Sequence, residues 1–135
     1  MNVEEHVIYQ LRNAKVNVYP YPHFFVENVF PSKFYSKLIG SLAADDHYTA
    51  MGGNYPSRFF GENHIPEGCE FMGEDRFINE VLTIFYHWFN KLSAGNKIPL
   101  SSDVRLIRDK QGYQIGPHTD AAWKMVSLLF YLPPS

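Results

Sequence analysis

The sequence predicts an α+β fold in which most of the helix precedes most of the sheet. Three segments within the first 92 residues carry apolar side chains at helical spacing. After Ile98 the apolar pattern changes to the two-residue period that is typical of strands. The sequence shows no repeat, linker or second domain, so we expect a single domain over residues 1–135.

The first two expected elements are a short helix and a bent edge strand. Residues 3–14 show the apolar spacing of an amphipathic helix that packs over a sheet. Residues 16–30 alternate and are rich in β-branched and aromatic side chains, which favours a strand. Pro20 and Pro22 interrupt that stretch, and proline is excluded from central ladders. We therefore expect an edge strand with a bend.

Two further helices are predicted. One begins at Pro31-Ser32, where the Ser32 hydroxyl is suited to cap it, and its apolar stripe runs to Leu42. The other, over residues 74–92, has the strongest helical pattern of the chain. It starts with Glu74 and Asp75, where the helix dipole favours acidic side chains. A helix-stop signal, Ser93-Ala-Gly95-Asn, follows it.

The stretch over residues 44–73 is the least regular and is full of turn-forming residues. Connections of this length are usually either functional or disordered. Two interpretations stay open. The first is a lid or substrate-binding segment, with contacts from Arg58, Tyr55 and the Phe59-Phe60 pair. The second is a surface excursion that contains a small hairpin.

Composition excludes several classes of function. The formal net charge is −2 and the charges form no basic or acidic block, so there is no electrostatic footprint for nucleic acid or for anionic membrane. The single cysteine, Cys69, excludes an internal disulfide and suits a reducing compartment. No apolar run approaches the length of a membrane span, and the first residues are not a signal peptide. We expect a soluble cytoplasmic protein.

Two strands and a candidate ligand pair follow the helices. Residues 104–108 alternate, with Arg105 and Ile107 on one face, and residues 125–132 form a second apolar strand that ends at Pro133-Pro134. Between them lies Gln111-Gly-Tyr-Gln-Ile-Gly-Pro-His118-Thr-Asp120. On an extended chain His118 and Asp120 point to the same side, so one metal ion can contact both. A nitrogen-plus-oxygen ligand set suits Fe(II) better than magnesium or calcium.

The residues around this pair resemble a known family. Three motifs of this chain resemble the first half of the 2-oxoglutarate- and Fe(II)-dependent dioxygenases, near the prolyl-hydroxylase-like branch. They are Arg105-Leu-Ile-Arg108, Gly112-Tyr113-x-Ile-x-Pro-His118-Thr-Asp120 and Leu128-Leu-Phe-Tyr131-Leu. The close match covers about residues 103–133. A looser match extends from Tyr21-Pro22-His23-Phe24 to Leu42.

The resemblance implies a fold and a site. The fold would be a jelly roll, or double-stranded β-helix, with N-terminal helices packed on the sheet. His118 and Asp120 would be two ligands of a His-x-Asp…His triad that holds Fe(II). Tyr131 lies where related hydroxylases place a tyrosine that binds 2-oxoglutarate, although a tyrosine inside the barrel is an equal alternative. Arg108 and Tyr113 are further candidates for the cofactor pocket.

The implied reaction is the oxidative decarboxylation of 2-oxoglutarate to succinate and carbon dioxide, coupled to hydroxylation of a substrate C–H bond. The substrate would be a small molecule or a peptide, and the fold does not name it.

The chain also departs from the family pattern. The family places a third ligand, a histidine, and a 2-oxoglutarate-binding arginine or lysine downstream of the Asp. No histidine follows Asp120 here, so the third ligand and the basic residue that the family places after it are both missing; the other five histidines all lie upstream. We therefore expect the N-terminal half of an oxygenase, inactive alone or associated through the exposed edge of its last strand. A catalytically inactive jelly-roll binding module is one alternative. An enzyme completed by a histidine from another chain is a second.

Overall fold

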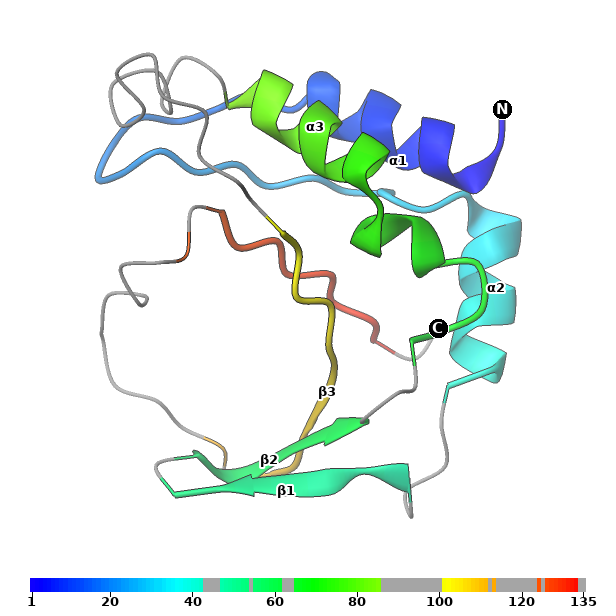
Figure 1. Cartoon of the computed structure of the whole chain (residues 1–135), viewed down its shortest axis with the longest axis vertical. Helices are drawn as coiled ribbons and strands as arrows, with labels where there is room; N and C mark the ends of the chain where they lie inside the picture. Colours follow the sequence, from blue (N-terminus) through cyan, green and yellow to red (C-terminus); the bar gives the residue numbers. More distant parts are fainter. Residues whose placement is uncertain are drawn as a thin grey trace. The chain divides into compact units, whose positions relative to one another are not determined.

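The structure is a computed structural model of the 135-residue chain, and it describes residues 1–42, 47–53, 55–61, 65–85, 101–111, 113, 124 and 126–133. In chain order the elements are α1, α2, β1, β2, η2, α3 and β3 (Figure 1). The α+β prediction is confirmed. The chain divides into two compact units, which we call the helical unit (Met1–Ser41 and Pro66–Val104) and the sheet unit (Leu42–Ile65 and Arg105–Ser135).

Helix α1 spans Val3–Arg12 and begins with a capping box. The backbone N–H of Glu5 donates to the Asn2 side chain at 2.8 Å, and the N–H of Asn2 donates to the Glu5 carboxylate at 3.1 Å. The helix ends two residues earlier than predicted. Both the backbone N–H and the side-chain amide of Asn13 donate to the Tyr9 carbonyl, which terminates the turn.

Helix α2 spans Ser32–Gly40, and its N-terminus differs from the prediction. Pro31 occupies the N-cap position and no side chain caps the helix, so the prediction of Ser32 as the cap was wrong. Ser32 already belongs to the first turn, and its carbonyl accepts a hydrogen bond from the Ser36 hydroxyl at 3.2 Å. Leu38, which is 2% exposed, is the best-buried side chain of this helix.

The short 3-10 helix η2 (Glu70–Gly73) leads directly into α3, which spans Asp75–Ile84. The predicted helix over 74–92 is therefore confirmed as far as Ile84, and its remainder from residue 86 lies outside the described residues. Phe71 of η2 packs edge-on against Phe77 of α3, with ring centres 5.3 Å apart. Helix α3 packs beside α1, and an ion pair between Arg12 and Glu80 joins the two helices (Figure 1).

The predicted edge strand over 16–30 was wrong. Its described residues form one isolated antiparallel bridge, in which Asn17 and His23 exchange backbone hydrogen bonds of 2.8 and 2.9 Å. Between them, Pro20 and Pro22 have no N–H to donate, so the ladder cannot extend inward from this pair. The segment is a loop that closes on itself at one point.

Among its described residues, the sheet unit contains three antiparallel strands in the order β1-β2-β3. Strand β1 (Thr49–Gly52) and strand β2 (Tyr55–Gly61) form a hairpin, so the irregular stretch does contain the small hairpin that one interpretation expected. Strand β3 (Leu106–Asp109) pairs with β2, with Arg58 opposite Asp109 and Gly61 opposite Leu106. The strand predicted over 104–108 is thus shifted toward the C-terminus.

The segment over residues 126–133 differs from its prediction. A strand was expected over 125–132, but the described residues 126–133 are assigned to no strand. They nevertheless keep a two-residue period of exposure, because Val126, Leu128, Phe130 and Leu132 are half-buried and the residues between them are exposed.

None of the helices in the described part of the chain has the length and apolarity needed to cross a membrane.

Candidate functional site

The predicted iron ligands, His118 and Asp120, lie outside the described residues, so their pairing remains a prediction. The other candidates are described in different degrees. The backbone of Tyr55 is in β2, and its side chain is not described. Arg58, Tyr113, Arg108 and Tyr131 all have described side chains. The geometry of these four decides what the site can be built from.

Arg58 is the centre of the best-defined polar cluster in the sheet unit. Because Arg58 and Asp109 face each other across β2 and β3, their side chains leave the same face of the sheet. The Nε and Nη2 atoms of Arg58 each donate to one carboxylate oxygen of Asp109 at 2.7 Å. The guanidinium carbon lies 4.1 Å from the ring centre of Tyr113. We call Arg58, Asp109 and Tyr113 the Arg58 cluster.

The backbone also fixes where Tyr113 lies. The N–H of Lys110 donates to the Ser57 carbonyl at 2.9 Å, and the N–H of Tyr113 donates to the Lys110 carbonyl at 3.1 Å. The residues after β3 therefore fold back as a turn that is tied to β2. Ser57 has a φ of 65°, a left-handed conformation that costs a non-glycine residue about 1–2 kcal/mol. That conformation directs the carbonyl that holds the turn.

The phenol oxygen of Tyr113 is the unusual atom of this cluster. It is buried, and it has no hydrogen-bond partner within the described part of the chain. Native proteins pair nearly all buried polar atoms, because an unpaired one costs roughly 1–3 kcal/mol. An oxygen acceptor on a bound ligand would provide the hydrogen bond that this hydroxyl lacks.

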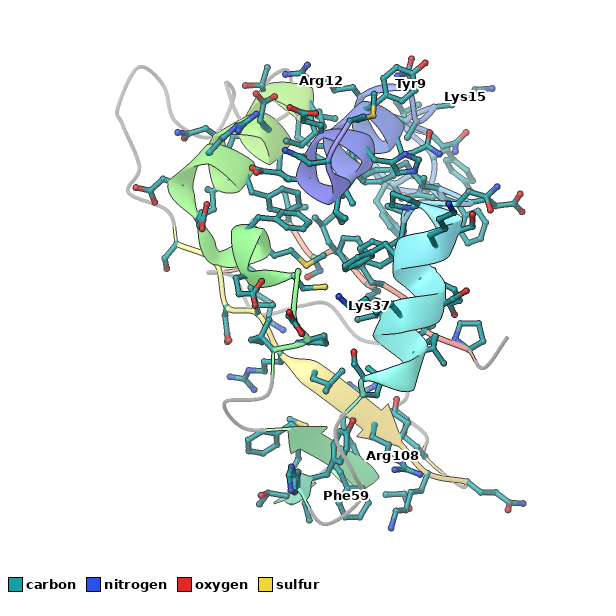
Figure 2. The ribbon with its side chains drawn as sticks, turned by 90° about the vertical axis from the view of Figure 1, so that its right-hand side faces the viewer. Tyr9, Arg12, Lys15, Lys37, Phe59 and Arg108 are labelled. Carbon is teal, nitrogen blue, oxygen red and sulfur yellow. The ribbon has the colours of Figure 1, made fainter. Side chains whose placement is uncertain are left out.

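The other face of the sheet carries a different arrangement. Arg108 alternates with Asp109 along β3, so its side chain leaves the opposite face from the Arg58 cluster. Its guanidinium lies 5.7 Å from the ring centre of Tyr48, and the Lys110 ammonium lies 4.5 Å from that of Phe59. Figure 2 labels Arg108 and Phe59, which lie at the strands of the sheet unit. Burial raises the pKa of the Tyr48 phenol, which therefore stays protonated at neutral pH. The structure does not bring Arg108 and Tyr113 together.

Tyr131, the third candidate for the cofactor pocket, is 77% exposed. It lies on the same side of its extended segment as Leu129, which is 72% exposed. Its role as a 2-oxoglutarate ligand therefore stays a prediction.

The described residues were compared with the ligand sets that metal ions need. Among them, no group of three or more histidine, cysteine, aspartate or glutamate side chains is placed to hold a metal ion. Cys69 is buried, and burial together with the charge of Glu70 raises the pKa of its thiol to about 11. The thiol thus stays protonated at neutral pH and is a poor ligand or nucleophile.

Sequence reasoning identified Arg58 and Tyr113 separately and missed Asp109, which joins them. Asp109 was expected in a turn, whereas it is the last residue of β3. Only the register between β2 and β3 reveals the pair, and local patterns do not fix that register. Comparisons of the chain with models of protein families, with curated proteins and with solved structures give no match.

Proposed function

We propose that this chain functions in a 2-oxoglutarate- and Fe(II)-dependent dioxygenase that hydroxylates a small-molecule or peptidyl substrate. The observation that carries the proposal is the motif Gly112-Tyr-Gln-Ile-Gly-Pro-His118-Thr-Asp120, followed by the apolar segment with Tyr131. The α+β architecture with an antiparallel sheet is compatible with a jelly roll, which we propose as the complete fold.

The donor set fits the metal. One neutral imidazole and one carboxylate are borderline and hard ligands, a combination that suits Fe(II). When bound, iron and 2-oxoglutarate supply the oxidative decarboxylation that is coupled to substrate hydroxylation. His118 and Asp120 would hold the metal. Tyr113 and Tyr131 would donate hydrogen bonds from their phenols to carboxylate or carbonyl oxygens in the pocket.

The proposal requires a third protein ligand. Within these 135 residues no histidine follows Asp120, and the histidines upstream do not match the family's third position. His118 and Asp120 are therefore the two ligands that the proposal assigns to this chain.

Anaerobic binding of Fe(II), with and without 2-oxoglutarate, tests the proposal. The expected result is a weak visible charge-transfer band that needs both additions and disappears in His118→Ala. The matched control is His47→Ala, which removes an exposed histidine in the sheet unit and should leave the band unchanged. Because the proposal requires a third ligand, the band is sought in a protein that supplies this ligand together with residues 1–135.

A folded protein without the band would contradict the proposal. Equilibrium binding of 2-oxoglutarate by calorimetry would then separate two cases. Binding without a metal-dependent band would favour the catalytically inactive binding module, and no binding would exclude the 2-oxoglutarate site altogether.

A further inference from the structure

We infer that Arg58 is a positioning residue, which holds the Tyr113 ring so that the phenol donates a hydrogen bond to a carboxylate or carbonyl oxygen of the bound ligand. This inference rests on the proposed function, because the ligand is the keto acid or substrate of that oxygenase. The sequence motif around His118 and Asp120 does not predict this role for the Arg58 cluster, and the alternation of side chains along the strands does not predict it either.

The first step concerns the guanidinium nitrogens of Arg58 that Asp109 engages. The sequence made Arg58 a candidate for direct contact with the substrate. In the structure, its Nε and one terminal nitrogen are both engaged by Asp109 in a two-point pair. Such a pair fixes the plane of the guanidinium, which is the reason that arginine rather than lysine suits this position. What Arg58 then presents to Tyr113 is a flat, fixed face.

The second step concerns the ring. A guanidinium 4.1 Å from the ring centre restricts the ring on that side, since the cation is attracted to the π face. The backbone of Tyr113 is held independently through Lys110 and Ser57. The ring is therefore positioned both by its own turn and by strand β2.

The third step concerns the hydroxyl. The Tyr113 oxygen is buried and lacks a partner among the described residues. Tyr113 is five positions before His118, so the two Cα atoms are at most about 18 Å apart along an extended chain. The proposed function places the ligand beside His118, and the inference assigns this hydroxyl to the same pocket. A phenol donates to an anionic or carbonyl oxygen without losing its proton.

Two variants separate the parts of this inference. Tyr113→Phe keeps the ring that contacts Arg58 and removes only the hydroxyl. Arg58→Met removes the pair with Asp109 and the cation over the ring, and keeps an unbranched side chain. Arg12→Met is the matched control, because it removes an arginine that pairs with a carboxylate in the helical unit. Circular dichroism and thermal unfolding establish that each variant is folded.

The first measurement needs no ligand. The protein is labelled with 3-fluorotyrosine, and the Tyr113 signal among the nine tyrosines is identified by its absence in Tyr113→Phe. We expect Arg58→Met to shift and broaden that signal in the fluorine spectrum, and Arg12→Met to leave it unchanged. An unaltered Tyr113 signal in a folded Arg58→Met protein would overturn the positioning role.

The second measurement is a titration of 2-oxoglutarate into the Fe(II)-loaded protein under nitrogen. We expect Tyr113→Phe and Arg58→Met each to weaken binding by up to about ten-fold, the effect of one lost hydrogen bond. The double variant should bind no more weakly than Tyr113→Phe alone, because Arg58 acts only through that hydroxyl. A merely structural Arg58 would add its own loss, and such additivity would contradict the inference.

The two failures are distinguishable. If the wild-type protein shows no 2-oxoglutarate-dependent change, the proposed function fails and the ligand half of this inference fails with it. If the wild-type protein binds 2-oxoglutarate and both variants bind it equally well, the proposed function stands and the inference is wrong.

Discussion

The helical unit and the sheet unit are stabilised in different ways. Of the buried apolar side chains in the described residues, all but Leu106 belong to the helical unit, where Val7, Leu38 and Phe77 are among them. In the sheet unit, half-exposed side chains contact one another through an ion pair and through cations over aromatic rings.

This difference implies that one unit supplies most of the stability and the other holds the candidate ligand-binding residues. Hydrophobic burial is the dominant favourable term in folding, so the helical unit should contribute most of the unfolding free energy. The candidate ligand-facing residues lie in the sheet unit, where the described side chains make polar contacts and fewer of them are buried. Binding regions are commonly drawn from the less stable part of a fold. The predictions below test whether the two units differ to this extent.

The largest effect is expected for Leu38→Ala in α2. Leu38 is 2% exposed, and a buried Leu→Ala change costs about 2–5 kcal/mol through lost transfer free energy and a residual cavity. The matched control is Leu129→Ala in the sheet unit, where the side chain is 72% exposed and the expected change is within about 0.5 kcal/mol. Urea unfolding followed by circular dichroism measures both, and equal losses would contradict the comparison.

A smaller loss is expected for Gly68→Ala, which tests one contact of the helical core. Gly68 has a φ of 90°, and an added Cβ would lie 2.6 Å from a ring carbon of Phe34. Strain at the positive φ and the overlap together should cost about 2–3 kcal/mol. Gly53→Ala shares the positive φ, at 56°, and its Cβ would meet nothing within 4 Å. The difference between the two melting temperatures therefore isolates the contact with Phe34.

The helical unit could be predicted largely from sequence, because its determinants are local. The apolar spacing of α1 and α3, and the acidic residues at their first turns, are sufficient to locate both helices. The prediction of an edge strand over residues 16–30 was wrong because an alternating, aromatic-rich pattern does not ensure that a partner strand is present. Two prolines limited it to the single Asn17–His23 bridge.

The sheet unit could be predicted only in part, because its determinants are distant in sequence. Arg58 and Asp109 are 51 positions apart, and their contact exists only in one register of β2 against β3. A shift of one residue would place Arg58 opposite a different side chain and on the other face. The His118 and Asp120 pair has the opposite status, since its motif is local and is visible in sequence alone.

The next effect appears only at high pH. Burial and the charge of Glu70 raise the pKa of the Cys69 thiol from its ordinary value near 9 to about 11 in the folded helical unit. The folded state thus binds this proton more tightly than the unfolded state does. The resulting stability is present in full below pH 9 and is lost as the pH rises toward 11.

Chemical unfolding at a series of pH values measures this loss. Cys69→Ala removes the titrating group, so its stability should decline less steeply between pH 9 and 11 than that of the wild-type protein. Parallel curves for the two proteins would show that the thiol is not buried as strongly as its position in the helical core implies.

The smallest effects compare one ion pair from each unit by double-mutant cycles. Arg58 and Asp109 are 25% and 37% exposed and form a two-point pair, whereas the side chains of Arg12 and Glu80 are 55% and 27% exposed. We expect a coupling free energy of about 1 kcal/mol for the first pair and at most about 0.5 kcal/mol for the second. Because salt screens exposed charges more than half-buried ones, 0.5 M NaCl should remove most of the Arg12–Glu80 coupling and less of the Arg58–Asp109 coupling. If the two couplings were equal and equally sensitive to salt, Arg58 would be an ordinary surface arginine. A stronger and more salt-resistant Arg58–Asp109 pair would instead mean that the stronger of the two ion pairs is the one whose arginine contacts Tyr113.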